Sequence, residues 1–280
     1  MRVHICGARG STPAPGADFV RYGGHTSCVA VAHDGALPSL VLDAGTGLQR
    51  LSKVFGAEPF SGSILLSHLH WDHTHGLPFF PAGDRPEARV NLLLPDQEGG
   101  AKVLEQLFAP PHFPITTADL RGDWTVDVLE AGEHSLEGFS VLALDIPHKG
   151  GRTFGYRVTD TTGDRPRSVA YLSDHSPINL GPGPFGDGEV HEAALALCSG
   201  VDLLLHDAQY TWAEFPARKT FGHSTIDYAV RLAEAAEVGR LVLFHHDSSR
   251  TDDAMDACEA ALQDRAIPVT AAVEGAVFDL

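Results

Sequence analysis

Short runs of hydrophobic residues recur along the whole chain and end at glycine, aspartate or proline. Runs of this length, rich in valine, isoleucine and leucine and bounded by turn-forming residues, predict β-strands. We expect strands at residues 3–6, 28–32, 40–43, 64–67, 90–94, 126–129, 141–145, 155–158, 169–173, 203–206 and 241–245.

Between the later strands, apolar positions recur at the spacing of a helix face. The clearest pattern covers residues 226–233, with Ser224 or Thr225 as the N-cap. Weaker patterns predict helices at residues 47–55, 101–108, 190–198 and 252–262. Strands dominate the first half and helices cluster later, so an α/β (α+β) protein with two sheets and helices packed outside fits better than regular βαβ alternation.

The chain has 280 residues, of which 43% are hydrophobic, and this is ample for one core. Strand patterns continue on both sides of the Pro-rich and Gly-rich segments 110–114 and 181–188, which therefore read as surface loops. We expect a single domain that spans residues 1–280.

The formal net charge of −17 argues against an extended nucleic-acid surface. The four cysteines are far apart and form no CxxC pair, which favours a reducing compartment and a cytoplasmic protein. No stretch approaches the roughly 18 apolar residues of a membrane helix, and the first residues resemble a strand. We expect a soluble, unprocessed chain without a membrane partner.

The segment 67–76 reads SHLHWDHTHG and follows an apolar strand. At a strand end, His68 and His70 project to one side and can hold one ion, while Asp72 and His73 in the following turn face a second position. The HxHxDH spacing therefore predicts two metal positions, both still lacking ligands. A structural histidine cluster is the alternative.

Three more candidate ligands stand where a strand pattern runs out into a loop: His148, Asp174 and His245. We assign His148 to the first ion, His245 to the second, and Asp174 to a bridge between them. Alone, each would read as a loop histidine or a turn aspartate.

Together these residues resemble the metallo-β-lactamase-fold hydrolases, in the branch of ribonuclease Z and the small cyclic phosphodiesterases. The resemblance covers nearly the whole chain. Its signatures are GARGSTP at 7–13, LDAGTG at 42–47, HxHxDH, LHDA at 205–208, GHST at 222–225 and LFH at 243–245.

This resemblance implies a four-layer αββα sandwich with two divalent metal ions, usually Zn2+ and sometimes Mn2+. Its ligand set agrees with the assignment above: His68, His70 and His148 for one ion, Asp72, His73 and His245 for the other, and Asp174 as the bridge. It also implies that His223 donates a proton to the leaving oxygen, with Asp207 as its acidic partner. Relatives often dimerise, so a homodimer is compatible.

Three departures from the branch stand out. Ribonuclease Z has a long tRNA-gripping arm between the third metal histidine and the bridging aspartate, but only 25 residues separate His148 from Asp174 here. The pair His245-His246 offers two histidines where the family has one, so His246 is an alternative ligand. After Asp174 the branch often has Asp-Thr, where this chain has His-Ser.

Two metal ions close together lower the pKa of a shared water and stabilise an in-line displacement at phosphorus. We therefore expect a phosphodiesterase for a small or cyclic phosphodiester, with Asp72 or Asp174 orienting the hydroxide. Hydrolysis of an ester, thioester or lactone is the alternative, tRNA 3′-processing is less favoured, and a diiron or non-catalytic module is the third class.

Several other side chains are candidates for substrate contact. Arg9, Arg21 and Lys149 could offer positive charge to a phosphate, although Arg21 reads better as a surface residue. Trp71 and the pair at 79–80 could form a substrate wall, but the hydrophobic core is the favoured reading.

Overall fold

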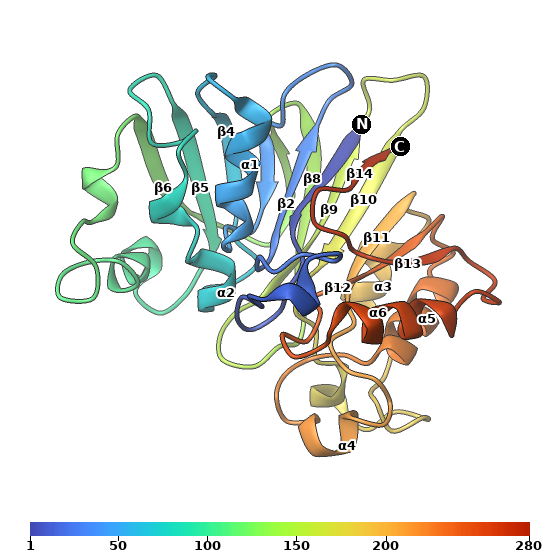
Figure 1. Cartoon of the computed structure of the whole chain (residues 1–280). Coiled ribbons are helices and arrows are strands. Elements are labelled where there is room, and N and C mark those ends of the chain that lie inside the picture. The colour runs from blue at the N-terminus through green and yellow to red at the C-terminus, as the bar shows by residue number, and fades with distance from the viewer.

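The computed structural model describes residues 1–280. Its strands form two seven-stranded sheets (Figure 1). The order in the first sheet is β14 (Val277–Asp279), β1 (Arg2–Gly7), β2 (Cys28–Ala32), β3 (Leu40–Leu42), β4 (Ser61–Leu65), β5 (Arg89–Pro95) and β6 (Asp123–Leu129). The order in the second is β13 (Val269–Ala271), β12 (Leu241–Phe244), β11 (Leu203–Asp207), β10 (Arg167–Leu172), β9 (Phe154–Asp160), β8 (Phe139–Asp145) and β7 (Gly132–Leu136).

Helices connect these strands. The α-helices are α1 (Gly47–Phe55), α2 (Trp71–Thr74), α3 (Glu192–Cys198), α4 (Phe215–Arg218), α5 (Ile226–Ala235) and α6 (Asp252–Ala260). Short 3-10 helices lie at Ala17–Phe19, Leu77–Phe79, Gly100–Gln106, Thr117–Asp119 and Pro177–Leu180. No helix combines the length and the apolar character needed to span a membrane.

Three layers of buried apolar side chains hold the sheets and helices together. Between the sheets, residues such as Val3 and Val141 form one cluster. On the outer face of the first sheet, Leu48 and Leu51 of α1 pack against strand residues. Leu197 of α3 packs in the same way on the second sheet, together with residues of α5. The layers follow the order helix, sheet, sheet, helix, which confirms the predicted αββα sandwich.

One edge of the sandwich collects the ends of several strands. Strands β3 to β6 are parallel to one another, and so are β10 to β13. Strand β8 runs in the direction of β10 because both are antiparallel to β9. In Figure 1, α2 and the end of β12 lie at this same lower edge. Ligands bind beyond the carboxyl ends of strands in sheets of this kind.

The structure differs from the sequence expectations in local detail. Thr225 is the N-cap of α5, because its side chain accepts a hydrogen bond from the Tyr228 N–H. The expected helix at 101–108 is a 3-10 helix at Gly100–Gln106, in which only Leu104 is buried. One apolar anchor does not support a longer α-helix. Strands β7, β13 and β14 were not predicted, since they are short or mainly polar.

Candidate metal centre

The HxHxDH segment leaves β4 at the carboxyl-end edge. His68 and His70 lie in extended chain after Ser67, and Asp72 and His73 lie in the single-turn helix α2. The segment closes at Gly76, where a Cβ atom would lie 2.0 Å from the carbonyl oxygen of Gly45. Only glycine lets this turn pack so closely on the preceding loop.

The first cluster consists of nitrogen atoms of His68, His70 and His148 and one oxygen of Asp174, all within 4.8 Å of one another. His148 Nε2 lies 3.3 Å from His70 Nδ1 and 3.4 Å from Asp174 Oδ2. Ligand atoms of a tetrahedral zinc ion at about 2.1 Å are separated by about 3.4 Å. The donor set and its spacing therefore fit one metal ion.

The second cluster joins Asp72, His73, His245 and the other oxygen of Asp174. Asp174 Oδ1 lies 3.0 Å from His73 Nε2 and 3.2 Å from His245 Nε2, and Asp72 Oδ2 lies 3.1 Å from His245 Nε2. Asp174 thus belongs to both clusters, one oxygen to each. The structure brings together all seven residues that the sequence predicted as ligands.

Several of these converging atoms lack hydrogen bonds. The Nε2 atoms of His68 and His73 and Oδ1 of Asp174 are buried without a hydrogen-bond partner. Leaving a buried polar atom unsatisfied costs about 1–3 kcal/mol, so three in one place require an explanation. A divalent ion bound by their lone pairs supplies one.

The backs of the histidine rings are fixed by acceptors. His73 Nδ1 donates to Asp43 Oδ2 at 2.7 Å, and His148 Nδ1 donates to the carbonyl of Gly222 at 2.7 Å. Asp43 also accepts hydrogen bonds from the Ser67 N–H and the Tyr171 hydroxyl. A proton on Nδ1 leaves the lone pair on Nε2, where a metal needs it.

The adjacent histidines 245 and 246 point in different directions. His245 has a φ of +57°, and its ring enters the second cluster. His246 Nε2 instead donates to the carbonyl of Ala272 at 2.9 Å, and burial lowers the pKa of His246 to about 3. The alternative assignment of His246 as the ligand therefore does not fit the geometry.

The pKa values of the histidines differ between the two clusters. Burial lowers the pKa of His68 and His70 below the usual value and that of His148 to about 4, so these imidazoles are neutral and able to bind a metal. Burial opposes protonation of His245 as well, but the carboxylates of Asp174 and Asp72 outweigh it and raise the pKa of His245 to about 9.

His223 stands beside the second cluster with a carboxylate behind it. Its Nδ1 lies 3.0 Å from Asp207 Oδ2, so Nδ1–H donates to Asp207. Asp207 is buried and also accepts from the backbone N–H of His175 and of Gln209. This pairing, expected from the GHST and LHDA signatures, leaves His223 Nε2 as the other ring nitrogen able to carry a proton.

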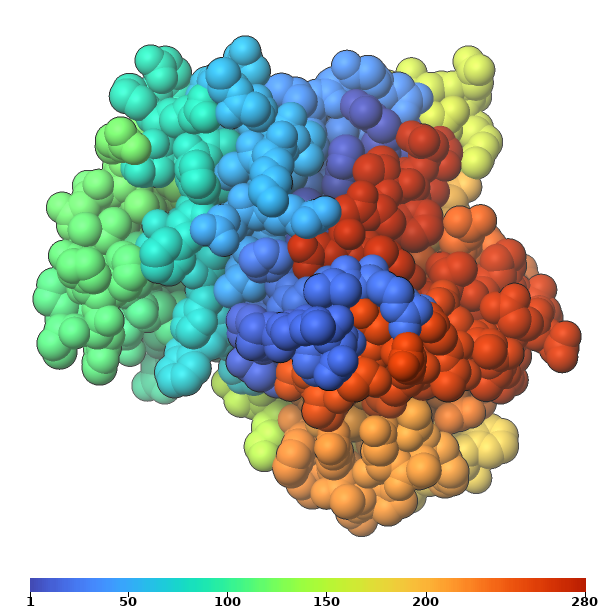
Figure 2. All heavy atoms as spheres, viewed as in Figure 1, coloured from blue at the N-terminus to red at the C-terminus, as the bar shows by residue number.

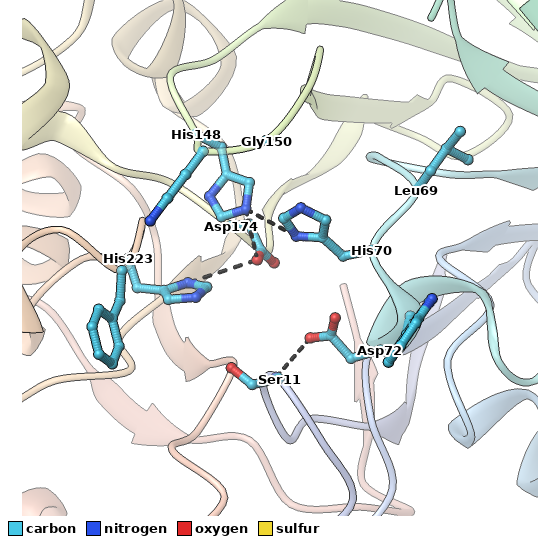
Figure 3. A pocket seen from close by; sticks show the side chains of 11 residues that line it. Ser11, Leu69, His70, Asp72, His148, Gly150, Asp174 and His223 are labelled. Carbon is cyan, nitrogen blue, oxygen red and sulfur yellow. Dashed lines mark hydrogen bonds and ion pairs between the residues drawn. The ribbon is translucent and has the colours of Figure 1, made fainter. Parts of the chain in front are cut away.

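A cavity of about 500 Å³ opens onto the metal centre (Figure 3). In Figure 3, Ser11 and Asp72 lie on the opposite side of this cavity from His148 and Gly150. The full lining is Ser11, Leu69, His70, Trp71, Asp72, His148, Lys149, Gly150, Asp174, Phe221 and His223. The orange segment around α4, which precedes Phe221, projects from the body of the molecule in Figure 2.

Sequence reasoning was wrong about Trp71 and missed Phe221. Trp71 is 67% exposed, lines the cavity and stacks on His75, so it does not belong to the core. Phe221 is 58% exposed and lines the same cavity. Phe79 and Phe80 were also expected in the core. Phe80 is buried, whereas Phe79 is half exposed and lies outside this cavity.

Two of the three candidate cations are engaged elsewhere. Arg9 is buried and donates to backbone carbonyls of Gly23 and Arg250, so it holds the fold together. Arg21 pairs with surface aspartates, as its surface reading predicted. Only Lys149 lines the cavity, and its Nζ donates to the carbonyl of Thr220.

The αββα sandwich with a His/Asp cluster at its edge defines a metallo-β-lactamase-fold hydrolase. The chain belongs to the beta-lactamase superfamily, since the profile of the Beta-lactamase superfamily domain matches residues 40–246. Ribonuclease BN of Salmonella paratyphi C is 29% identical over 253 residues, which cover 75% of this chain and 77% of the relative.

Solved structures show the same fold. YhfI from Bacillus subtilis superposes with a TM-score of 0.72 and 19% identity over 99% of both chains. A diphosphatase of the PhnP family has a TM-score of 0.72 and 19% identity over 100% of this chain and 97% of its own. The short form of human tRNase Z has a TM-score of 0.67 and 21% identity, and the match covers 100% of this chain and 99% of that chain. The expected resemblance to this branch is confirmed.

Proposed function

We propose that this chain is a dinuclear metal-dependent phosphodiesterase for a small phosphodiester. The observation that carries the proposal is the pair of four-atom clusters that share Asp174, with the His223–Asp207 pair beside them. We assign His68, His70 and His148 to one ion, Asp72, His73 and His245 to the other, and Asp174 to both. The donor atoms suit zinc and also accept manganese.

Two ions held there would lower the pKa of a water molecule and polarise the phosphoryl group. A carboxylate, that of Asp72 or that of Asp174, would orient the attacking water. His223, whose Nδ1–H is held by Asp207, donates a proton from Nε2 to the leaving oxygen.

The shape of the site supports a small substrate. A cavity of about 500 Å³ has room for a ligand of roughly mononucleotide size. The 25 residues between His148 and Asp174 contain the whole of β9 and β10, which leaves no tRNA-binding arm. With a net charge of −17, this supports a partner that is a small molecule instead of an extended nucleic acid.

The test is hydrolysis of bis(4-nitrophenyl) phosphate by protein reconstituted with Zn2+ or Mn2+, beside a 4-nitrophenyl carboxylic ester. We expect turnover of the phosphodiester that Asp174→Asn abolishes. His223→Gln should slow substrates with poor leaving groups more than the nitrophenyl ester, because nitrophenolate needs little proton assistance. Turnover of the carboxylic ester alone would overturn the phosphodiesterase assignment in favour of an esterase or lactonase.

A further inference from the structure

The loop after β1 presents one side chain to the cavity in an unusual backbone conformation. Ser11 lines the cavity and has a φ of +66°, a region that serine rarely adopts. Five non-glycine residues have positive φ, and three of them, Ser11, Asp43 and His245, surround the metal centre. Backbone strain of this kind persists where the surrounding structure enforces it and gathers at functional sites.

The surroundings of Ser11 do enforce this conformation. The Gly10 N–H donates to the His246 carbonyl, and the His246 N–H donates to the Ala8 carbonyl. A Cβ atom on Gly10 would lie 2.4 Å from His245 Nδ1, so the loop packs directly on that ring. The Ser11 N–H then donates to Asp72 Oδ2 at 2.6 Å. The backbone of Ser11 therefore has a partner in the metal centre itself.

The hydroxyl of Ser11 has a different environment. Gln209 Nε2 donates to Ser11 Oγ at 3.2 Å, and this is the only hydrogen bond that the hydroxyl makes. Gln209 is only 3% exposed, and its backbone N–H is held by Asp207. Because Oγ accepts from Gln209, its own proton is free to be donated. The residue lies on the cavity wall, so an acceptor for that proton can come from a bound ligand.

We propose that Ser11 Oγ–H donates a hydrogen bond to a non-bridging phosphoryl oxygen of the substrate, which makes Ser11 a substrate-binding residue. The assignment rests on the proposed phosphodiesterase function. Lys149 is the only lysine or arginine of the cavity, and Arg9 is turned into the fold. Apart from the metal ions and Lys149, the hydrogen bonds to a phosphate must come from neutral groups of the lining, and Ser11 is placed to donate one.

The test uses two variants that both remove the hydroxyl but differ in their effect on the backbone strain. Ser11→Ala keeps the strained positive φ, whereas Ser11→Gly relieves it. Both keep the N–H that binds Asp72. Thr12→Val is the matched control, because it removes a hydroxyl from the next position of the same loop, outside the cavity.

Binding of inorganic phosphate to the zinc-loaded proteins is measured by calorimetry, and zinc content and unfolding are measured alongside. We expect both Ser11 variants to bind phosphate about 10-fold to 100-fold more weakly, as for a lost hydrogen bond to a charged group, with zinc retained. Thr12→Val should bind like the wild type. The KM for bis(4-nitrophenyl) phosphate should rise in parallel.

Wild-type affinity in Ser11→Gly, or a loss confined to Ser11→Ala, would overturn the proposal, because the effect would then belong to the backbone. The phosphate measurement does not depend on turnover. If the wild type fails to hydrolyse the phosphodiester, the proposed function fails, while the assignment of Ser11 as a phosphate donor is still decided by the binding data.

Discussion

The two ends of the sandwich both place histidine next to carboxylate, but they satisfy these groups in opposite ways. At the end away from the metal centre, His33 Nδ1 lies 2.9 Å from Asp160 Oδ2, and His33 Nε2 lies 3.0 Å from the Glu137 carbonyl. At the other end, Nε2 of His68 and of His73 has no hydrogen-bond partner. A satisfied histidine holds structure together, whereas converging unsatisfied nitrogens are suited to bind an ion.

The His33–Asp160 pair also shows what the far end does. His33 follows β2 of the first sheet, and Asp160 ends β9 of the second. The hydrogen bond between them therefore ties the two sheets together. The cluster around Asp174 joins the same two sheets, but through side chains that we assign to metal ions. Because both ends join the two sheets through histidine and carboxylate side chains, a substitution at one end can serve as the control for a substitution at the other.

The largest expected effect comes from Asp174→Asn. The change replaces one shared carboxylate oxygen with an NH2 group and leaves the other oxygen uncharged, so we expect a loss of at least about a thousandfold in kcat, the scale of several kcal/mol of transition-state stabilisation. Zinc content measured by mass spectrometry should fall below two ions per chain. Asp160→Asn is the control at the far end and should keep both the metal and the activity. An active, fully metallated Asp174→Asn protein would refute the bridging assignment.

Asp43 lies at the metal end, but its carboxylate accepts hydrogen bonds from several side chains, as Asp160 does at the far end. It is buried and accepts hydrogen bonds from His73, Ser67 and Tyr171. In Asp43→Asn, His73 loses its charged acceptor, so we expect zinc affinity to fall about 10-fold to 100-fold in a chelator competition. The free energy of unfolding should fall by about 3 kcal/mol in urea. Unchanged zinc affinity would show that Asp43 supports only the fold.

The candidate ligands of the metal end could be predicted from the sequence because most of them follow a short, regular spacing. Six residues of HxHxDH follow one strand, and the remaining ligands stand at the ends of apolar runs such as the one before His245. Strand ends that run in the same direction meet at one edge, so the ligands could be assembled without coordinates. The choice between His245 and His246 needed the structure, which shows the ring of His245 in the second cluster and that of His246 on the Ala272 carbonyl.

The features that the sequence did not reveal depend on exposure and on distant contacts. Trp71 has a large apolar side chain of the kind that usually packs in the core, and only the structure shows its indole at the cavity. From the sequence, Arg9 is a candidate phosphate ligand, but in the structure its guanidinium donates hydrogen bonds to backbone carbonyls of Gly23 and Arg250. Ser11 has no signature of its own beyond its loop. Strand β7 alternates exposed and half-buried residues, and it therefore lacks a hydrophobic run.

The open side of the metal end is tested by Trp71→Ala. The indole stacks on His75 with an interplanar angle of 16°, which leaves its other face available to a ligand. Losing one aromatic contact costs about 1 kcal/mol, so KM for an aryl phosphodiester should rise about fivefold with little change in kcat. Phe79→Ala is the matched control, because Phe79 is also an exposed aromatic side chain but lies outside the cavity. Equal effects of both variants would argue against a substrate contact at Trp71.

The smallest expected effect concerns the pH dependence of the far end. Burial alone would raise the pKa of Asp160, but hydrogen bonds from Thr162 and His33 outweigh it and lower the pKa below the usual carboxyl value. A carboxyl with a lowered pKa stabilises the fold above its unfolded pKa of about 3.9, and this contribution is lost as the pH falls further. We therefore expect Asp160→Asn to be less stable than the wild type by about 1 kcal/mol at pH 6, with the difference shrinking below pH 4. Urea unfolding at several pH values measures it. A constant difference across this range would show that the charge of Asp160 does not contribute to the stability.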